Sequence, residues 1–475
     1  MINFKINTDK AFYYRKAIRF DVYKLRNAKL RKCINNICNE MLSIYIQKAK
    51  RVRNLKERKH ACFYILLNLW KAYYLTLNPW VSYSRDKNKY NKGQRLNKLH
   101  FKYEAFIQTH NDMVEEGLIV NKENVHYPEY SFTSRMKASN KLIKLFDHVS
   151  QDSNLISSLT KQKGLDEIVI KNKKKQPIKY RANRQIKQWR ENLITINNKL
   201  LSARICLDME NEQYQELIER LNKDRDRVDY FPDFTSVTLH RVFNNSSIDQ
   251  GGRFFGGWWQ SIPREYRKFI DINYKPTEEV DYSGHHIRIL YSIDNKNLEG
   301  EPYEVEDESR NTQEFIDERK IATLVMLNCS SYTEAHETLK TMGYKSSKFL
   351  MNEIIHRHEP IKDNFFKGIG NKLMNEDSKI AEEVMLRMIK LGHVILPVHD
   401  SFIVRNSATF ELKPIMEEVF NKYCKNKTIL KTKETSLEWN SEQTKIKGKL
   451  KLNDEKFLEK YFNNRTIVNS IWDPS

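Results

Sequence analysis

The stretch around Asp400 constrains the fold more than any other part of the sequence. Residues 393–405 read His-Val-Ile-Leu-Pro-Val-His-Asp-Ser-Phe-Ile-Val-Arg, so two strongly apolar runs flank a short polar step. Apolar runs of this length on either side of a turn are typical of a β-hairpin with buried strands. We therefore expect Asp400 at the tip of a hairpin.

The segment before this hairpin is expected to be a helix that packs beneath the sheet. Apolar residues recur there at intervals of three and four, the spacing of one buried helix face. Gly392 is a suitable terminator. The residues expected to face inward are Ile380, Ala381, Val384, Met385, Met388 and Leu391.

A second aspartate, Asp281, ends another predicted strand, and Gly284 then allows the chain to turn before the next apolar segment. If the two aspartates lie on adjacent strands of one sheet, their charges repel one another unless cations intervene. Two Mg2+ or Mn2+ ions about 4 Å apart would relieve this repulsion, activate a hydroxyl group and stabilise a leaving pyrophosphate. The pair therefore favours phosphoryl or nucleotidyl transfer, although either aspartate alone is more typical of a turn cap.

Glycine is scarce but clustered. The chain has 14 glycines and 11 prolines, which favours long helices over a turn-rich β protein. Four glycines nevertheless fall within residues 251–257, and this concentration indicates backbone that turns tightly or approaches another group closely. Trp258 and Trp259 follow, and their size favours packing over base stacking.

The charge of the chain favours a nucleic-acid partner. There are 82 Lys and Arg residues against 61 Asp and Glu residues, a formal net charge of +21. Each cation that neutralises a phosphate releases a condensed counterion, so a polyanion binds such a surface well. The alternative is a basic surface that is only solvated.

Cysteine usage and hydropathy indicate a soluble cytoplasmic protein. None of the six cysteines has the spacing of a zinc hook, which favours free thiols in a reducing compartment. The longest apolar stretch, residues 61–70, is too short to cross a bilayer, and the first residues lack a secretory pattern. We therefore expect no membrane partner.

The first part of the chain is expected to be basic and helical. Residues 1–60 form a basic helical segment. Residues 61–147 contain an apolar helix, a basic loop, a helix near residues 100–115 that ends at Gly117, and a β-hairpin. The two strands expected in this hairpin are 118–120 and 125–127.

This order of helices and strands resembles the winged-helix modules of replication-initiator proteins. The resemblance implies that the helix at 100–115 enters the DNA major groove and that the hairpin contacts phosphates or the minor groove. The alternative is a small helical domain that only packs on its neighbour.

Residues 148–229 are expected to form a helical linker or a thumb-like region. A lysine-rich run at 171–175 suits a linker or a loop that contacts phosphates. Beyond this run, apolar residues at helical spacing predict one buried face, made of Ile186, Trp189, Leu193, Ile196 and Leu200.

Several segments resemble the sequence motifs of template-directed polymerases, in the same order. Residues 281–290, Asp-Tyr-Ser-Gly-His-His-Ile-Arg-Ile-Leu, are similar to motif A of family A DNA polymerases. Residues 398–402, Val-His-Asp-Ser-Phe, are similar to motif C of the related single-subunit, phage-type RNA polymerases. Gly252-Arg253 with Gln260-Ser-Ile-Pro263 is similar to the element that precedes motif A, and a predicted helix at 318–328 matches motif B best.

The resemblance implies a set of site residues. Asp281 and Asp400 would bind two Mg2+ or Mn2+ ions, with the backbone carbonyl of Tyr282 as a further ligand. Lys320 would contact the triphosphate, and Arg319 is the alternative cation. The other implied contacts are Asn328 and His286 at the nucleotide, His399 at the primer end, and Arg253 and Gln260 at the duplex. His286 stands where family A DNA polymerases keep a glutamate that blocks the ribose hydroxyl.

The predicted fold class is α+β. A mostly helical N-terminal half with a winged helix would precede a right-hand polymerase palm, with an antiparallel sheet and helical fingers, in residues 230–475. The implied function is two-metal nucleotidyl transfer by a DNA-directed DNA polymerase that replicates a virus or mobile element. Its partners would be DNA template and primer, nucleoside triphosphates and other replication proteins. No proofreading exonuclease is expected before residue 230.

Three other functions stay open. A phage-type DNA-directed RNA polymerase or primase is favoured by Ser401 after Asp400 and by His286. A non-catalytic winged-helix replication initiator or regulator would bind DNA without synthesis. A metal-dependent nuclease would cut it without nucleotides.

Overall fold

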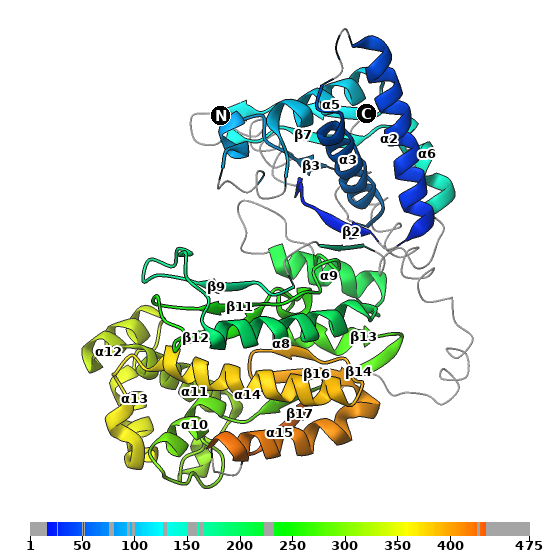
Figure 1. The fold of residues 1–475 in the computed structure, drawn as a ribbon. Coiled ribbons are helices and arrows are strands. Elements are labelled where there is room, and N and C mark those ends of the chain that lie inside the picture. Colours follow the sequence, from blue (N-terminus) through cyan, green and yellow to red (C-terminus); the bar gives the residue numbers. More distant parts are fainter. Residues whose placement is uncertain are drawn as a thin grey trace.

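The computed structural model describes residues 17–433 except 26, 50, 52, 76–79, 93–95, 97–99, 127–130, 151–158, 162–164, 223–231 and 425–427. The chain forms an N-terminal unit of residues 17–161 and a C-terminal unit of residues 165–433, each with its own large hydrophobic core (Figure 1). Both units combine helices with largely antiparallel sheets, so the predicted α+β class is confirmed.

The N-terminal unit packs helices on one small sheet of strand order β1-β3-β7-β4. Its elements are β1 (Ile18–Arg19), β2 (Tyr23–Leu25), α2 (Ala28–Lys48), α3 (Leu55–Leu75), β3 (Val81–Ser82), η1 (Lys87–Tyr90), α5 (Tyr103–Glu115), β4 (Ile119–Lys122), β5 (Val125–His126), β6 (Ser131–Phe132), β7 (Arg135–Ala138), α6 (Asn140–Ser150) and β8 (Leu159–Lys161).

Two predictions for this unit are wrong. The predicted boundary at residue 60 falls inside α3, because α2 and α3 pack together and share one core. The predicted hairpin of 118–120 with 125–127 does not form either. β4 pairs with β7 and β5 pairs with β6, so the two segments lie in succession along one arm of a longer hairpin. Residue 127 lies outside the described residues.

The C-terminal unit contains a sheet of order β10-β13-β14-β16-β15, with β17 also paired to β14, and a second sheet of order β12-β11-β9. Its elements are β9 (Ile168–Ile170), α8 (Arg184–Leu201), β10 (Ile205–Leu207), α9 (Asn211–Asn222), β11 (His240–Phe243), β12 (Gly251–Phe255), η2 (Trp258–Gln260), η3 (Arg264–Phe269), β13 (Ile270–Ile272), β14 (Lys275–Tyr282), α10 (His285–Ile293), η4 (Glu308–Arg310), α11 (Gln313–Asn328), α12 (Tyr332–Thr341), α13 (Ser347–Arg357), η5 (Glu359–Asn364), α14 (Gly370–Lys390), β15 (Leu396–Val398), β16 (Ser401–Arg405), η6 (Asn406–Ala408), α15 (Thr409–Cys424) and β17 (Leu430–Lys433).

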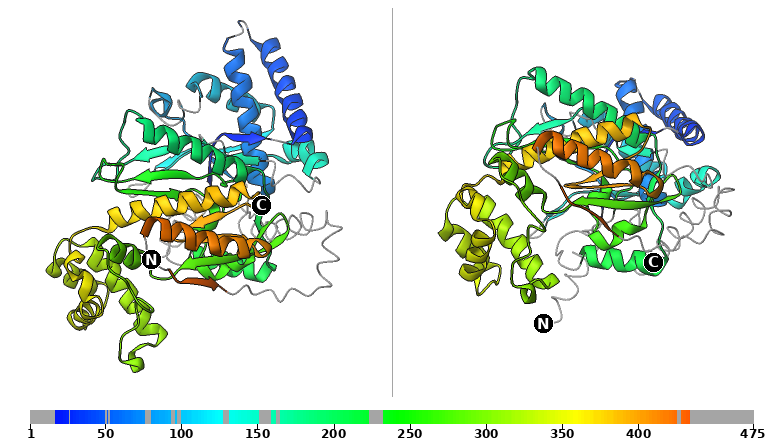
Figure 2. Two further views of the ribbon diagram at one scale, coloured as in Figure 1. Left: turned by 60° about the horizontal axis from the view of Figure 1, so that its bottom comes forward. Right: turned by 90° about the horizontal axis from the view of Figure 1, so that it is seen from below.

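The segment predicted as a linker, 148–229, instead contributes to both sheets of this unit. β9 pairs with β11, β10 pairs with β13, and α8 packs against α14. The buried stripe predicted for α8 is confirmed, because all five of its residues are buried. Figure 2 shows α14 (gold) and α15 (orange) side by side along the unit.

Of the residues predicted to face inward on α14, all but one are buried. Leu391 is 55% exposed because it follows the last helical turn, and Gly392 after it has a φ of 90°. Trp258 and Trp259 are both buried in the core, as predicted. All six cysteines are free thiols in buried positions, and no helix in the described part of the chain could span a bilayer.

Arg241 on β11 joins the second sheet to α14 from a fully buried position. Its Nε donates to the Gly252 carbonyl at 2.8 Å, Nη2 donates to Ser378 Oγ at 3.1 Å, and Nη1 lies 3.1 Å from Glu382 Oε1. A Cβ on Gly252 would lie 2.8 Å from both a Phe243 ring carbon and Ser378 Oγ. The glycine cluster therefore lets β12 approach α14 closely.

We expect Arg241→Ala to lower the free energy of unfolding by about 3–5 kcal/mol, because it leaves the carboxylate of Glu382 buried without its cation. Guanidinium denaturation followed by circular dichroism measures this. The control is Arg190→Ala on α8, where the ion pair with Asp166 is long (4.0 Å) and partly exposed, and the expected loss is below about 1 kcal/mol. Equal losses in the two variants would contradict this account of α14.

Candidate active site

The pairing of β14 with β16 brings the two predicted aspartates together. The register sets Asp281 opposite Ser401, and the Tyr282 amide donates to the Asp400 carbonyl oxygen at 3.4 Å. Asp400 therefore lies diagonally across from Asp281, at the same end of two neighbouring strands. Both residues are partly exposed, so neither carboxyl group is sealed in the core.

Asp400 lies in a two-residue turn between β15 and β16, as predicted. Val398 pairs with Ser401, and His399 between them has a φ of 58°, which this tight turn imposes. Two hydrogen bonds anchor the strand before this turn, because Trp259 Nε1 and Gln260 Nε2 both donate to the Pro397 carbonyl, at 3.1 and 3.0 Å.

A buried carboxylate supports the other side of the turn. Ser401 Oγ lies 2.6 Å from Glu279 Oε1, and the Arg267 guanidinium donates to both Glu279 oxygens at 2.9 and 3.0 Å. Such two-point Arg–carboxylate pairs fix orientation as well as distance. Residues on β14, β16 and η3 therefore hold the strand ends that carry the two aspartates.

Asp377 on α14 was missed by the sequence reasoning, although it organises the residues beside the aspartate pair. It is buried, and its Oδ2 accepts from Arg253 Nε at 2.6 Å, while His285 Nε2 lies 3.2 Å from Oδ1. Burial raises the pKa of Asp377, but the charge of Arg253 and the contacts with His285 and His286 outweigh it and hold this pKa well below its ordinary value. A lone aspartate within a helix carries no sequence signal for this role.

The same network includes His286. Arg253 Nη2 lies 2.9 Å from His286 Nε2. The same ring nitrogen lies 3.9 Å from Asp377 Oδ2, so His286 contacts both members of the Arg253–Asp377 pair.

Tyr303 links α11 to the aspartate pair, and the sequence reasoning also missed it. Desolvation raises the pKa of its phenol, and the charges of Asp400 and Asp281 raise that pKa further. Lys320 Nζ lies 5.9 Å from the centre of the Tyr303 ring and 3.0 Å from Asp317 Oδ1. The predicted phosphate-contacting lysine therefore lies beside Tyr303, on α11.

His399 and Phe255 present exposed rings beside Asp400. The ring centres are 6.3 Å apart, and 37% of Phe255 is exposed. Desolvation and the charge of Arg253 lower the pKa of His399, whereas Asp400 and Asp377 raise it, and the net direction is downward. His399 is therefore mainly a neutral hydrogen-bonding group near pH 7.

Three residues that were predicted to contact the nucleotide or the duplex instead make hydrogen bonds within the protein. Arg319 is buried, and its guanidinium donates to the carbonyl oxygens of Tyr303 and Arg310, so it has a structural role. Gln260 uses its amide within the protein, since it also accepts from the Gly256 amide. Asn328 is exposed at the far end of α11, where it donates to the Leu324 carbonyl.

The donor set of the site is made of oxygen atoms. Among the described residues no group of three or more His, Cys, Asp or Glu side chains could hold a metal ion. The two aspartates and the Tyr282 carbonyl are hard ligands of the kind that Mg2+ prefers, and Mg2+ keeps several waters or substrate oxygens in its shell. The chemistry of these ligands would therefore suit Mg2+ if waters or other oxygen ligands completed its shell.

Comparison with known proteins adds weak structural similarity. No family model matches the chain, and no curated protein matches it. Among solved structures, it is similar to the POL domain of Pol1 from M. smegmatis in complex with DNA primer-template and dNTP, at 12% identity and a TM-score of 0.24. The match covers 52% of this chain and about half, 52%, of that domain. Similarity this low does not indicate a function, so any functional conclusion depends on the geometry of the site.

The lowered pKa of Asp377 predicts how acid affects stability. The ionised carboxylate stabilises the folded state above about pH 4, the ordinary pKa of aspartate, and this contribution is lost as the pH falls toward the folded pKa. We expect Asp377→Asn to be less stable at pH 7 and to lose less stability than the wild type between pH 5 and pH 3. Urea denaturation at each pH measures this, and parallel losses would show that Asp377 is not held ionised.

Proposed function

We propose that the chain is a template-directed nucleic-acid polymerase, with a DNA-directed DNA polymerase favoured, that works by two-metal nucleotidyl transfer. The observation that carries the proposal is the β14–β16 register, which sets Asp281 and Asp400 at one end of adjacent antiparallel strands with both side chains partly exposed. Two such carboxylates, beside an exposed lysine and a neutral histidine, suit the handling of a nucleoside triphosphate.

In this proposal Asp281, Asp400 and the Tyr282 carbonyl hold Mg2+ or Mn2+. Two bound ions would lower the pKa of the primer 3′-hydroxyl and stabilise the charge on the leaving pyrophosphate. The role of the protein residues is to fix the strand ends, which the Arg267–Glu279–Ser401 contacts achieve from inside the sheet.

Lys320 is the residue proposed to bind the triphosphate. Its side chain is 42% exposed, and among the described residues its ammonium group pairs with Asp317 alone, one turn away on the same helix. An exposed pair of this kind is weak. A triphosphate, with more charge than one carboxylate, can therefore displace Asp317 and draw Lys320 toward the aspartates.

The primer end is proposed to lie against His399 and Phe255. His399 can donate to or accept from the terminal sugar, and the exposed Phe255 ring offers a stacking surface next to it. Arg253 on β12 keeps 17% of its side chain exposed while its Nε donates to Asp377. A duplex contact is proposed for Arg253, but not for Gln260, whose amide is used internally.

A phage-type RNA polymerase or primase is the second candidate, and two observations favour it. Ser401 is a neutral residue that faces inward, so motif C supplies a single acid. His286 replaces the glutamate that blocks the ribose hydroxyl in family A DNA polymerases, and its Nε2 lies 2.9 Å from Arg253 Nη2. Such a site imposes no negative charge near the sugar.

The N-terminal unit is proposed to contact DNA as a winged-helix-like module. Its order α3, β3, α5, β4, β7 and its antiparallel β3-β7-β4 arrangement are those expected of such a module. Insertion of α5 into the major groove is disfavoured, because α5 contains no Lys or Arg and exposes Glu104 and Glu115. The cations closer to the sheet are Lys122 and Lys137, which both lie 5.2 Å from the Trp80 ring centre.

Primer extension with Mg2+ tests the proposal. We expect Asp281→Asn and Asp400→Asn each to reduce nucleotide incorporation by at least about a hundredfold, because loss of a metal ligand costs more than loss of a group that only orients a ligand. Separate deoxynucleotide and ribonucleotide pools distinguish the DNA polymerase from the RNA polymerase or primase.

The matched control is Glu278→Gln, which removes another acid from β14 and should retain incorporation. Unchanged incorporation in both aspartate variants would contradict the roles proposed for Asp281 and Asp400. DNA binding by a wild-type protein that incorporates no nucleotide would favour a non-catalytic DNA-binding protein. Template cleavage without nucleotides would indicate a nuclease instead.

A further inference from the structure

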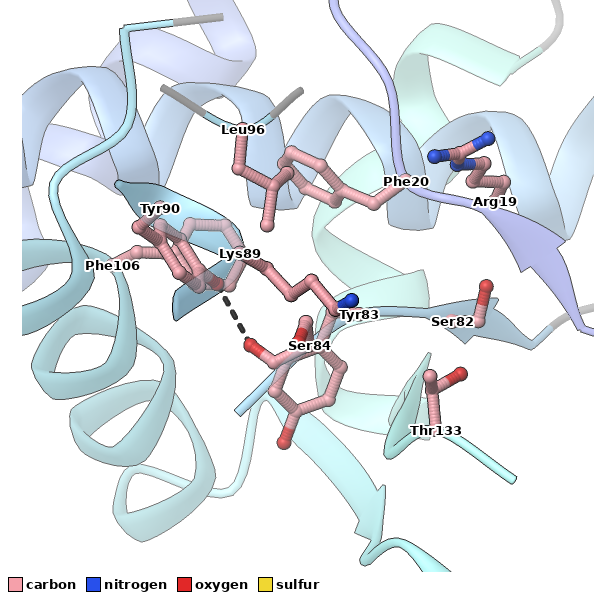
Figure 3. Close-up of a pocket in the computed structure, with 10 residues that line it drawn as sticks. All are labelled: Arg19, Phe20, Ser82, Tyr83, Ser84, Lys89, Tyr90, Leu96, Phe106 and Thr133. Carbon is pink, nitrogen blue, oxygen red and sulfur yellow. Dashed lines mark hydrogen bonds between the residues drawn. The ribbon is translucent and has the colours of Figure 1, made fainter. Parts of the chain in front are cut away.

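The N-terminal unit contains a cavity of about 310 Å³ that the polymerase proposal does not use (Figure 3). It lies between β1, β3, η1 and α5, whereas Asp281 and Asp400 belong to the C-terminal unit (Figure 1). The residues that line it are Arg19, Phe20, Ser82, Tyr83, Ser84, Lys89, Tyr90, Leu96, Phe106 and Thr133. Its size is at the lower end of the range for small-molecule sites.

The floor of the cavity is aromatic and rigid. Phe20, Tyr83, Tyr90 and Phe106 are all buried, and the Phe20 and Phe106 rings meet edge to face at 5.1 Å. The Tyr90 hydroxyl donates to the Ser84 carbonyl at 2.8 Å, and the Tyr83 hydroxyl donates to Asn121 Oδ1 at 2.8 Å. These bonds fix both phenol rings, so the floor is preformed for a flat apolar group.

The rim of the cavity is cationic and rich in hydroxyl groups. Arg19 and Lys89 are exposed, and no Asp or Glu is among the lining residues. Figure 3 shows the Lys89 side chain crossing the opening toward the side where Arg19, Ser82 and Thr133 lie. Among the described residues, no carboxylate lies within ion-pair distance of the Lys89 ammonium group. Such a rim suits an anion.

We propose that this cavity binds one nucleotide, either free or as an unpaired unit of a nucleic-acid strand. An inorganic anion would leave the aromatic floor unused, and an uncharged apolar ligand would leave the Lys89 ammonium group unused. A nucleotide satisfies both, because its base has a π face for the floor and its phosphate meets Lys89 and the rim hydroxyls. The cavity volume accommodates a single nucleotide.

Isothermal titration calorimetry on the full chain tests this inference. EDTA is present so that metal-dependent binding at Asp281 and Asp400 does not contribute, which separates this site from the polymerase proposal. The probes are AMP, adenosine, and a short oligothymidylate with and without a 5′-phosphate. We expect AMP to bind more tightly than adenosine, or the 5′-phosphorylated strand more tightly than the unphosphorylated one. Tighter binding of AMP would indicate a free nucleotide, and tighter binding of the 5′-phosphorylated strand would indicate an unpaired unit of a nucleic acid.

Two substitutions at exposed positions locate the binding. Lys89→Ala should weaken it by at least about tenfold, the effect of losing one ionic hydrogen bond. Thr133→Trp should abolish it by filling the cavity. The matched control is Lys87→Ala on the same turn, whose ammonium group pairs with Glu104, and it should change the affinity by less than about twofold. Equal effects of Lys89→Ala and Lys87→Ala, or no binding of any probe at about 1 mM, would overturn the proposal.

Discussion

The antiparallel pairing of β14 with β16 is the constraint on which the site depends. It sets Asp281 opposite Ser401, so that Asp400, one residue earlier in a tight turn, meets it at the strand ends. A slip of one residue would turn Asp281 toward the core and bury its charge without a partner. The register is specified by burial, because Val280, Phe402 and Val404 all pack in the core of the C-terminal unit.

Around the two aspartates, buried or mostly buried arginines each pair with a buried carboxylate. Arg267 with Glu279 lies beneath the sheet, Arg253 with Asp377 lies beside it, and Arg241 with Glu382 holds the second sheet on α14. Removing one partner of such a pair lowers the free energy of unfolding strongly. The intact pair, in contrast, fixes geometry more than it adds stability. These ion pairs join β11 and β12 to α14, and η3 to β14.

Much of this could be predicted from local pattern. The hairpin, the strand that ends at Asp281, the buried face of α8 and the burial of both tryptophans follow from apolar periodicity and size. The unit boundaries could not be predicted, because β9 and β10 pair with strands far along the chain. Asp377 and Tyr303 were missed for the same reason: only the fold brings them to the site, and nothing in their sequence neighbourhood marks them.

The central claim is that Asp281 and Asp400 jointly hold divalent ions, and one measurement tests it most directly. Crystals grown with MnCl2, a primer-template duplex and a non-hydrolysable nucleotide would give anomalous diffraction from Mn2+. We expect two peaks about 4 Å apart, with carboxylate oxygens of both Asp281 and Asp400 in their coordination shells. An ordered complex with no peak at either aspartate would contradict it.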